Sequence, residues 1–497
     1  MANNSSNPAG GIRRLFQHSA IYALSSSIQR LQGLIMIPIY TSAVYLPDRS
    51  EFANYGLVYT FIAFMNFVYL YGMDSAFLRY FFLGKSDRKT VFSTTFLVLF
   101  ASGVLTSLLL TAFAGPLASL LLFSPELDQY IRLAALILLF DSLGNLPFLI
   151  LRSEERPVSF TVFRMIRFSL ELLLNIFFVV ILKKGVIGIL YANLIAAAVN
   201  MLVMSPFGLK YFKFGVDRAL LKEMVRFGLP FLPNGIAYMV IEMMDRFLVT
   251  EYLGKDTLAF YHANYKFASV LLLVIVGFRN AWQPFFLKIA NQPGARRTYS
   301  RILNLYLVAA GGITLFVTFF IQDLLTLHWF GEFYLLGRQY WEGIPIIPWI
   351  VLSYFFFGIY TIFTPAFYIT KKSHYMILFT GAGALLNVGF NLYFLPQLGI
   401  WAAVAATVLA YFAMAFTIYL VAQRIYPIPL NLPKIGLFLL LVGSTFFIYY
   451  IIAPPLLWRI LSFLILFGLL IAWGLSGDER AAFRRLIHGE KTGPETR

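Results

Sequence analysis

Cysteine is absent from this sequence of 497 residues, which excludes disulfides, iron–sulfur clusters and thiolate metal sites. Histidine occurs only five times, at scattered positions, and this argues against a metal held by imidazoles. We therefore expect no cofactor. Charged residues are also scarce, at 12% against 60% hydrophobic, and a soluble protein of this length needs far more charge on its surface.

Two long stretches contain no Asp, Glu, Lys or Arg: Thr90 to Pro125 and Ser373 to Gln423. A helix that crosses the bilayer needs about 20 apolar residues, so the first stretch accommodates one span and the second accommodates two. The sequence thus predicts an all-α polytopic membrane protein with a short lateral helix at Leu117–Phe123. We place about 14 transmembrane helices, near residues 17–45, 52–78, 90–113, 130–151, 158–182, 186–207, 225–250, 258–287, 302–321, 344–369, 375–395, 399–422, 435–453 and 456–474.

Positive charge is in excess and unevenly distributed. The net charge is +16, and 26 of the 39 Lys and Arg residues fall on the two termini and on alternate loops, against six on the remaining loops. Because cytoplasmic loops are the ones enriched in Lys and Arg, the N-terminus and the C-terminus are both predicted to be inside. The Lys183-Lys184 loop is the one clear exception. This pattern favours charge at a membrane surface, with no nucleic acid as a partner.

A weak internal repeat relates the two halves of the chain. Tyr45–Phe61 resembles Tyr252–Phe267, and Gly72–Phe82 resembles Gly277–Phe286, at offsets of 205 to 207 residues. Six predicted spans separate the copies, so both copies have the same orientation. The repeat therefore predicts two pseudo-symmetric six-helix bundles, related by an axis along the membrane normal, with a cavity between them.

Cations inside the predicted spans are candidates for a substrate site, because a charge at the bilayer centre is costly and usually faces protein or water. Arg30 lies mid-span in a polar stripe, while Arg79 and Arg279 lie toward the inner ends of equivalent helices. Lys266 shares a span with Arg279. Arginine suits a phosphate or diphosphate ligand. The alternatives are helix–helix hydrogen bonding for Arg30 and interfacial anchoring for Arg79.

Acidic residues inside the spans are candidates for ion coupling, with a structural role as the alternative for each. Arg167 and Glu171 are spaced for an ion pair on the fifth span, and Glu242 and Arg246 are spaced for another on the seventh. The remaining candidates are Asp74, Asp141 and Asp245.

The segment DRFLVTEYLGKDTLAFYHANYKF (Asp245–Phe267) resembles a phrase typical of O-antigen-type polysaccharide flippases. These belong to the multidrug/oligosaccharidyl-lipid/polysaccharide exporter superfamily. In the first half, EFANYGLVYTF and GMDSAFLRYFF are similar to the same family, whose second span ends in Gly-x-(Asp)-x-Ala-x-x-Arg-Tyr. The resemblance covers essentially the whole chain, and its motifs are more specific for the superfamily than for the substrate.

The resemblance implies a V-shaped cleft and a protein without catalytic activity that moves an anionic polyprenyl-diphosphate-linked oligosaccharide from the inner to the outer leaflet of the cytoplasmic (inner) membrane. Such transport serves the biosynthesis of cell-surface polysaccharide, for example lipopolysaccharide. The resemblance also implies a cationic cavity at Arg30 and Arg279, with Arg79 and Lys266 as weaker matches. Membrane lipid, H⁺ or Na⁺ as the coupling ion, and polysaccharide polymerase machinery are the implied partners.

The expected organisation follows from the repeat and the resemblance together. Two helices are expected to lie outside the core of six plus six. The segments are a cytoplasmic N-terminus (1–16), an N-terminal bundle (17–210), a cytoplasmic linker (211–224), a C-terminal bundle (225–424), two additional helices (425–475) and a cytoplasmic tail (476–497).

Three other functions remain open at this point. A peptidoglycan-precursor lipid flippase is a close relative of the same kind. A cation-coupled multidrug exporter usually has twelve spans and an acidic cavity. A membrane glycosyltransferase or polymerase would need catalytic carboxylates on a large outer loop, whereas the outer loops here are short.

Overall fold

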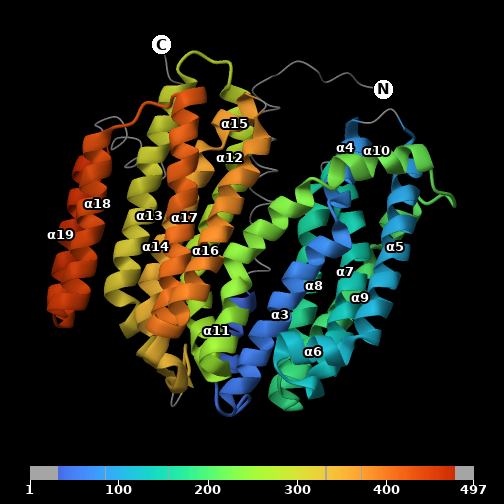
Figure 1. Ribbon diagram of the computed structural model, residues 1–497, viewed down its shortest axis with the longest axis horizontal. Helices are drawn as coiled ribbons and strands as arrows, with labels where there is room; N and C mark the ends of the chain where they lie inside the picture. The colour runs from blue at the N-terminus through green and yellow to red at the C-terminus, as the bar shows by residue number, and fades with distance from the viewer. Residues whose placement is uncertain (1–31, 84–85, 155, 331–332, 371, 476–497) are drawn as a thin grey trace.

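The computed structural model describes residues 32–83, 86–154, 156–330, 333–370 and 372–475, and this part of the chain is almost entirely helical (Figure 1). The first half contains α2 (Ile37–Tyr40), α3 (Arg49–Leu70), α4 (Met73–Leu83), α5 (Arg88–Ala112), α6 (Ala114–Leu122), the 3-10 turn η1 (Pro125–Leu127), α7 (Asp128–Ser153), α8 (Pro157–Asn175), the π-helical turn η2 (Ile176–Ile181) and α9 (Gly185–Leu209). Helix α10 (Arg218–Gly228) leads into the second half. The lateral helix predicted at Leu117–Phe123 corresponds to α6.

The second half contains α11 (Phe231–Ala268), α12 (Val270–Ile289), α13 (Ala295–Thr326), a hairpin of β1 (His328–Phe330) and β2 (Phe333–Tyr334), and η3 (Arg338–Ile346). It continues with α14 (Ile347–Phe363), α15 (Pro365–Ile369), η4 (Ser373–Tyr375), α16 (Met376–Leu398) and α17 (Ile400–Ile425). The last elements are α18 (Leu432–Phe447), the π-helical turn η5 (Ile448–Ile452) and α19 (Leu456–Gly474).

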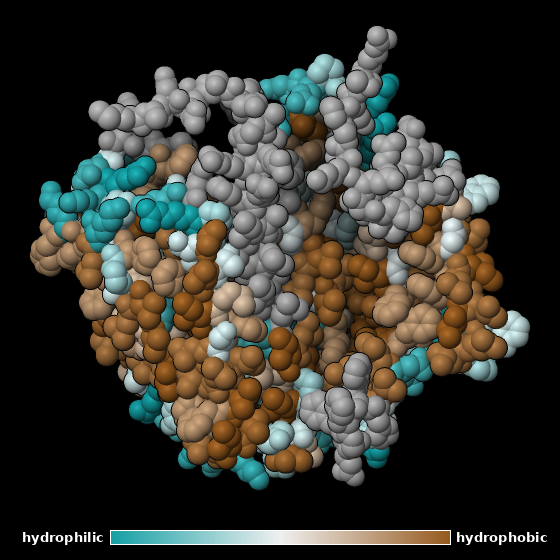
Figure 2. Space-filling model, turned by 180° about the vertical axis from the view of Figure 1, so that it is seen from behind, coloured by the Kyte–Doolittle hydropathy of each residue, from teal (hydrophilic) through white to brown (hydrophobic). Residues whose placement is uncertain are grey.

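The helices have the length and surface of membrane spans. In the described residues, 11 elements are long and apolar enough to cross a bilayer. Hydrophobic residues form a broad belt on the surface, with hydrophilic residues above and below it (Figure 2). The protein is therefore an all-helical multi-pass membrane protein, as predicted. The number 14 stays a prediction, because the first span lies largely outside the described residues and the fifth, at α8, is not among the 11. In addition, α11 joins the seventh span to the start of the eighth, whose remainder forms α12.

That double element, α11, is two helices joined at Gly254. Gly254 has φ 84° and ψ 169°, a conformation that is accessible essentially only to glycine. The chain therefore reverses there, between the spans predicted at 225–250 and 258–287. Sequence reasoning placed this turn correctly.

The second predicted span, 52–78, is interrupted. Helix α3 ends at Leu70, and both Tyr71 (φ 32°) and Gly72 (φ 78°) are left-handed before α4 begins. The cause is a close packing of backbones, since a Cβ on Gly72 would lie 2.0 Å from the carbonyl oxygen of Gly228 in α10. Asp74 follows in the first turn of α4, where a negative charge interacts favourably with the helix N-terminus.

The helices form two bundles. Helices α3 to α9 pack together in one bundle, and α11 to α17 pack together in the other, with α3 against α11 as the main contact between them (Figure 1). Helices α18 and α19 pack on α13, on the side of the second bundle away from the first. This agrees with the predicted two bundles and two additional helices, while the count of six spans in each bundle stays a prediction.

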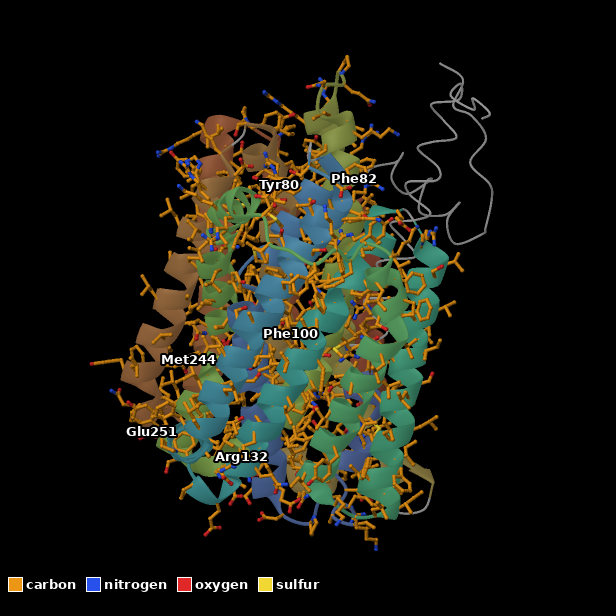
Figure 3. The ribbon with its side chains drawn as sticks, turned by 90° about the vertical axis from the view of Figure 1, so that its right-hand side faces the viewer. Tyr80, Phe82, Phe100, Arg132, Met244 and Glu251 are labelled. Atoms are coloured by element: carbon orange, nitrogen blue, oxygen red, sulfur yellow. The ribbon has the colours of Figure 1, made fainter. Side chains whose placement is uncertain are left out.

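The two ends of the molecule are distinct. The loops predicted to be cytoplasmic, around α4, α10 and α15, gather at one end, which we call the inner end (Figure 1). Tyr80 and Phe82 lie toward this end, whereas Arg132 and Glu251 lie toward the opposite, outer end (Figure 3). From behind, the surface is hollowed between the bundles, and the visible walls of the hollow are largely hydrophobic (Figure 2).

Candidate functional site

A cavity of about 520 Å³ lies between the two bundles and takes side chains from both. Tyrosine dominates its polar lining, with Tyr40, Tyr55, Tyr59, Tyr238, Tyr265 and Tyr354. Its charged lining residues are Glu171, Glu242, Arg246 and Lys266. The cavity can therefore offer flat aromatic faces, hydroxyl groups and both signs of charge to a large polar ligand.

Lys266 is enclosed by aromatic rings of the opposite bundle. Its Nζ donates a hydrogen bond to the Tyr55 hydroxyl over 2.8 Å and lies 4.2 Å from the centroid of the same ring. The rings of Tyr40 and Phe52 lie within 6 Å of it, at 5.8 Å and 5.7 Å. Cation–π contacts of this kind stabilise a desolvated ammonium group. The side chain predicted as a substrate cation thus joins the two bundles in this conformation.

Arg246 forms a buried network within the second bundle. Its Nη1 lies 2.9 Å from Asp245 Oδ1, and its Nε donates to His262 Nδ1 over 3.3 Å. Arg246 also donates to the Glu242 main-chain carbonyl and lies within electrostatic range of the Glu242 carboxylate, so the predicted pair stays a prediction. Tyr261 donates a short hydrogen bond to Asp245. Asp245 is therefore held by two partners and is fully buried.

The two carboxylates that line the cavity have hydrogen-bond donors without a charge. Tyr354 donates to Glu242 Oε1 over 2.6 Å, and the Gln32 side chain donates to Glu171. Glu171 also lies within electrostatic range of Arg167, and Glu242 within that of Arg246, so a proton or another cation would compete with an arginine at each carboxylate. Both residues therefore remain candidates for ion coupling.

A set of contacts between the bundles closes the outer end. Arg49 of α3 lies 2.8 Å from Glu342 of η3, and the Gly337 N–H donates to the Thr41 hydroxyl over 3.1 Å. The backbones touch there, since a Cβ on Gly337 would lie 2.0 Å from the Thr41 carbonyl oxygen.

Helix α3 starts at this outer closure, and its first turn is capped. The Asp48 carboxylate accepts hydrogen bonds from the Ser50 hydroxyl and the Ser50 backbone N–H, at 2.6 Å and 2.8 Å. These hydrogen bonds hold the pKa of Asp48 below its usual value. The start of α3, which carries Arg49, is therefore fixed at the closure.

Of the other predicted cations, Arg79 and Arg279 are not among the residues that line the cavity. Arg30 lies outside the described residues. Arg79 is exposed, and its guanidinium carbon lies 4.4 Å above the ring of Phe227 in α10, which agrees with an anchoring role. Arg279 is exposed on α12, within electrostatic range of Tyr360 and Tyr368.

The first bundle contains a separate ion pair. Arg167 of α8 lies 2.7 Å from Asp141 of α7, so its ion-pair partner is Asp141 and the predicted pair with Glu171 is wrong. Arg167 and Glu171 are four positions apart on α8, a spacing that permits an ion pair. The neighbouring helix α7, however, places the carboxylate of Asp141 closer to the Arg167 guanidinium. Asp141 thus belongs to a second polar site, apart from the cavity.

Sequence reasoning missed the tyrosines and His262. A signal for the tyrosines was present in the repeat: at an offset of 206, Tyr55 and Tyr59 match Tyr261 and Tyr265. Both pairs have a spacing of four, which places each pair on one helix face. The sequence alone gave no reason to place these faces in a cavity.

The comparisons with known proteins agree with this fold. The family described as "Polysaccharide biosynthesis protein" matches residues 46–336. No curated protein matches the chain. The lipid II flippase MurJ, in an inward closed conformation, has a TM-score of 0.67 at 15% identity, covering 94% of this chain and 99% of that one.

Two further solved structures are similar in the same way. A multidrug resistance MATE family transporter of the MOP superfamily, in an inward-facing conformation, has a TM-score of 0.63 at 18% identity, covering 82% of this chain and 97% of that one. A MOP superfamily transporter from Pyrococcus furiosus has a TM-score of 0.59 at 18% identity, covering 83% and 94%. Because the sequence identities are only 15% to 18%, the similarity to these three structures shows the fold of this chain and nothing more.

Proposed function

We propose that this chain, which belongs to the polysaccharide biosynthesis protein family, is a flippase for an anionic polyprenyl-diphosphate-linked oligosaccharide. It moves this substrate from the inner to the outer leaflet of the cytoplasmic membrane by alternating access. The observation that carries the proposal is the polar, tyrosine-lined cavity between two bundles whose contacts close the outer end. A cavity of this kind suits a sugar that must leave water on one side of a membrane and reach it on the other.

The transport cycle follows from the contacts between the bundles. The oligosaccharide occupies the cavity, the diphosphate binds Arg30 and Arg279, and the polyprenyl tail stays in the bilayer. Opening toward the outside requires the bundles to separate at Arg49–Glu342 and Thr41–Gly337. The aromatic packing of Phe52 against Tyr340 and His262 must part as well, so substrate and ion binding have to favour the open conformation strongly enough to offset the loss of these contacts.

Coupling to an ion gradient belongs to the same proposal. H⁺ or Na⁺ binds differently to the two conformations, with Glu171, Glu242 and Asp141 as the carboxylates available for it. Both termini lie in the cytoplasm, and polysaccharide polymerase machinery receives the flipped product. The proposal contains no catalytic step.

A cation-coupled exporter is the second candidate, and one observation favours it. The described lining of the cavity has as many carboxylates as cations, Glu171 and Glu242 against Arg246 and Lys266. A cationic compound could bind at the two carboxylates. An exporter and a flippase would give different results in the experiment described next.

The experiment is mass spectrometry of polyprenyl-linked intermediates in cells that lack this gene, with a non-permeant probe to determine their leaflet. We expect one diphosphate-linked oligosaccharide to accumulate in the inner leaflet. Reintroduction of the wild-type chain should clear it. Cells that show no accumulation but become sensitive to cationic compounds would contradict the flippase and support the exporter.

A further inference from the structure

A second polar pocket lies between α3, α7 and α8 in the first bundle. Its volume is about 270 Å³. Its lining residues are Asn66, Leu70, Asp141, Gly144, Asn145, Phe148, Arg164 and Arg167. Burial of two arginines and two asparagines at the depth of membrane-spanning helices costs free energy. This cost points to a ligand that these side chains bind.

The two arginines of this pocket are held in different ways. The Arg167 Nη2 lies 2.7 Å from Asp141 Oδ1, while the Arg167 Nε is buried and has no hydrogen-bond partner in the described part of the chain. The guanidinium of Arg164 lies 4.1 Å above the ring of Phe148, which fixes its plane. A buried guanidinium N–H without an acceptor is a cost that an oxyanion would remove.

This pocket lies on the inner side of the central cavity, along the same two helices. On α3, Tyr59 lines the cavity and Asn66, two turns further along, lines the pocket. On α8, Glu171 lines the cavity, and Arg164, seven residues nearer the inner end, lines the pocket. Seven residues span roughly 10 Å of helix. One extended ligand can therefore occupy both sites.

We propose that the pocket between α3, α7 and α8 is an oxyanion-binding subsite in which Arg164, Arg167 and the amides of Asn66 and Asn145 take an anionic group of the transported molecule. The subsite rests on the proposed function and refines it, because it places an anion next to the tyrosine-lined cavity. The anion is either a carboxylate of an acidic sugar or the diphosphate of the lipid carrier, and the second outcome would move the diphosphate from Arg30 and Arg279 to this subsite.

Asp141 is the competitor built into this subsite. It occupies one edge of Arg167, so an incoming oxyanion must displace it or share the guanidinium with it. A negative charge beside a bound anion also weakens the anion's binding. Asp141 therefore lowers the affinity of the subsite and allows the ligand to leave, which a transporter requires.

The test uses the purified full-length chain in lipid nanodiscs, with inorganic pyrophosphate, inorganic phosphate and glucuronate as separate probes. Arginine modification by phenylglyoxal is read at Arg164 and Arg167 by peptide mass spectrometry, and protection by each probe gives its apparent affinity. In D141N we expect pyrophosphate to bind roughly tenfold more tightly, because one repelling charge is removed. In R167Q we expect roughly tenfold weaker protection of Arg164.

The control variants are on α7, the helix that also carries Asp141. Asp128 and Arg132 form an exposed ion pair at 2.8 Å on α7, near the outer end, so D128N and R132Q should leave the affinity unchanged. Stronger protection by pyrophosphate than by glucuronate would assign the subsite to the carrier diphosphate, and the reverse order to an acidic sugar. Equal affinity in D141N and wild type, or no protection by any probe in either, would overturn the proposal.

The two proposals fail separately. If pyrophosphate or glucuronate protects Arg164 and Arg167 while cells without the gene accumulate no lipid-linked oligosaccharide, the subsite stands and the flippase assignment falls. If the oligosaccharide accumulates and no probe protects these arginines in wild type or D141N, the flippase stands and the subsite falls.

Discussion

Lys266 of the second bundle donates a hydrogen bond to Tyr55 of the first over 2.8 Å, and so joins the bundles at the wall of the cavity. A hydrogen bond from a charged donor typically contributes 1.5–3 kcal/mol. The pair is therefore strong enough to bias the equilibrium between the two conformations of a transporter. Its strength also makes it a suitable first target for mutation.

Tyr55→Phe should shift the chain toward the conformation that is open at the outer end. The ring remains and keeps its cation–π contact, but the acceptor for Lys266 is lost, so the expected shift is roughly tenfold or more. Because the chain has no native cysteine, spin labels can be placed at two introduced cysteines on the outer loops, and their distance distribution measures the shift.

Tyr59→Phe is the matched control for this substitution. Tyr59 lies one turn further along α3 and accepts a hydrogen bond from Asn193 of the same bundle at 3.0 Å. Loss of this hydrogen bond within one bundle should leave the distance distribution between the spin labels unchanged. Equal distributions in Tyr55→Phe and wild type would mean that Lys266 does not hold the bundles together.

Cross-linking Arg49→Cys to Glu342→Cys should stop transport. These residues face each other across the outer closure, at 2.8 Å between their charged groups, and separation of the bundles requires them to part. A short bifunctional thiol reagent with a reducible bond provides the link, and accumulation of the lipid-linked oligosaccharide provides the measurement. Reduction should restore transport. A linked Asp128→Cys and Arg132→Cys pair, within one helix, should have no effect; full transport by the linked Arg49–Glu342 pair would refute the cycle.

Gly72→Ala should destabilise the protein by about 2 kcal/mol or more. The residue has φ 78°, and a Cβ would meet the Gly228 carbonyl oxygen at 2.0 Å, so strain and collision act together. Gly277 is its counterpart in the repeat but lies inside α12 with no atom within 4 Å of a Cβ, so Gly277→Ala should be neutral or slightly stabilising. The loss of monodisperse protein on heating in detergent measures both. Similar behaviour of the two variants would show that the break between α3 and α4 is not needed for stability.

Neutralising Arg30 and Arg279 should abolish transport without reducing expression. These are the cations assigned to the substrate diphosphate, and a charge-assisted hydrogen bond to phosphate is not replaced by glutamine. Arg79→Gln should keep most of the activity, since Arg79 stacks on Phe227 and is exposed. The leaflet assay measures transport in each variant. Wild-type transport in Arg30→Gln/Arg279→Gln would remove these residues from the substrate site.

Much of the site could not be predicted from sequence, and the charged residues show why. The spacing of Arg167 and Glu171 along one helix permits a pair, yet Asp141 of another helix is the partner at 2.7 Å. In the same way, Arg246 has Asp245 and His262 as partners, and Glu242 has Tyr354. Spacing along a helix limits which pairs can form, while the rotation of neighbouring helices decides which ones do.

The sequence by itself determined the class of the protein, the turn near Gly254 and the lateral helix, because hydrophobic length and glycine conformation are local properties. The two additional helices outside the core were implied by the family resemblance. The sequence also determined the repeat, and with it the two bundles. Only the tertiary structure decided that Lys266 lies in an aromatic cage, that α3 breaks at Gly72 and that Arg164, Arg167 and Asp141 share a pocket. Each of these depends on segments far apart in the chain coming into contact, and the free energy of such a contact is not encoded in either segment alone.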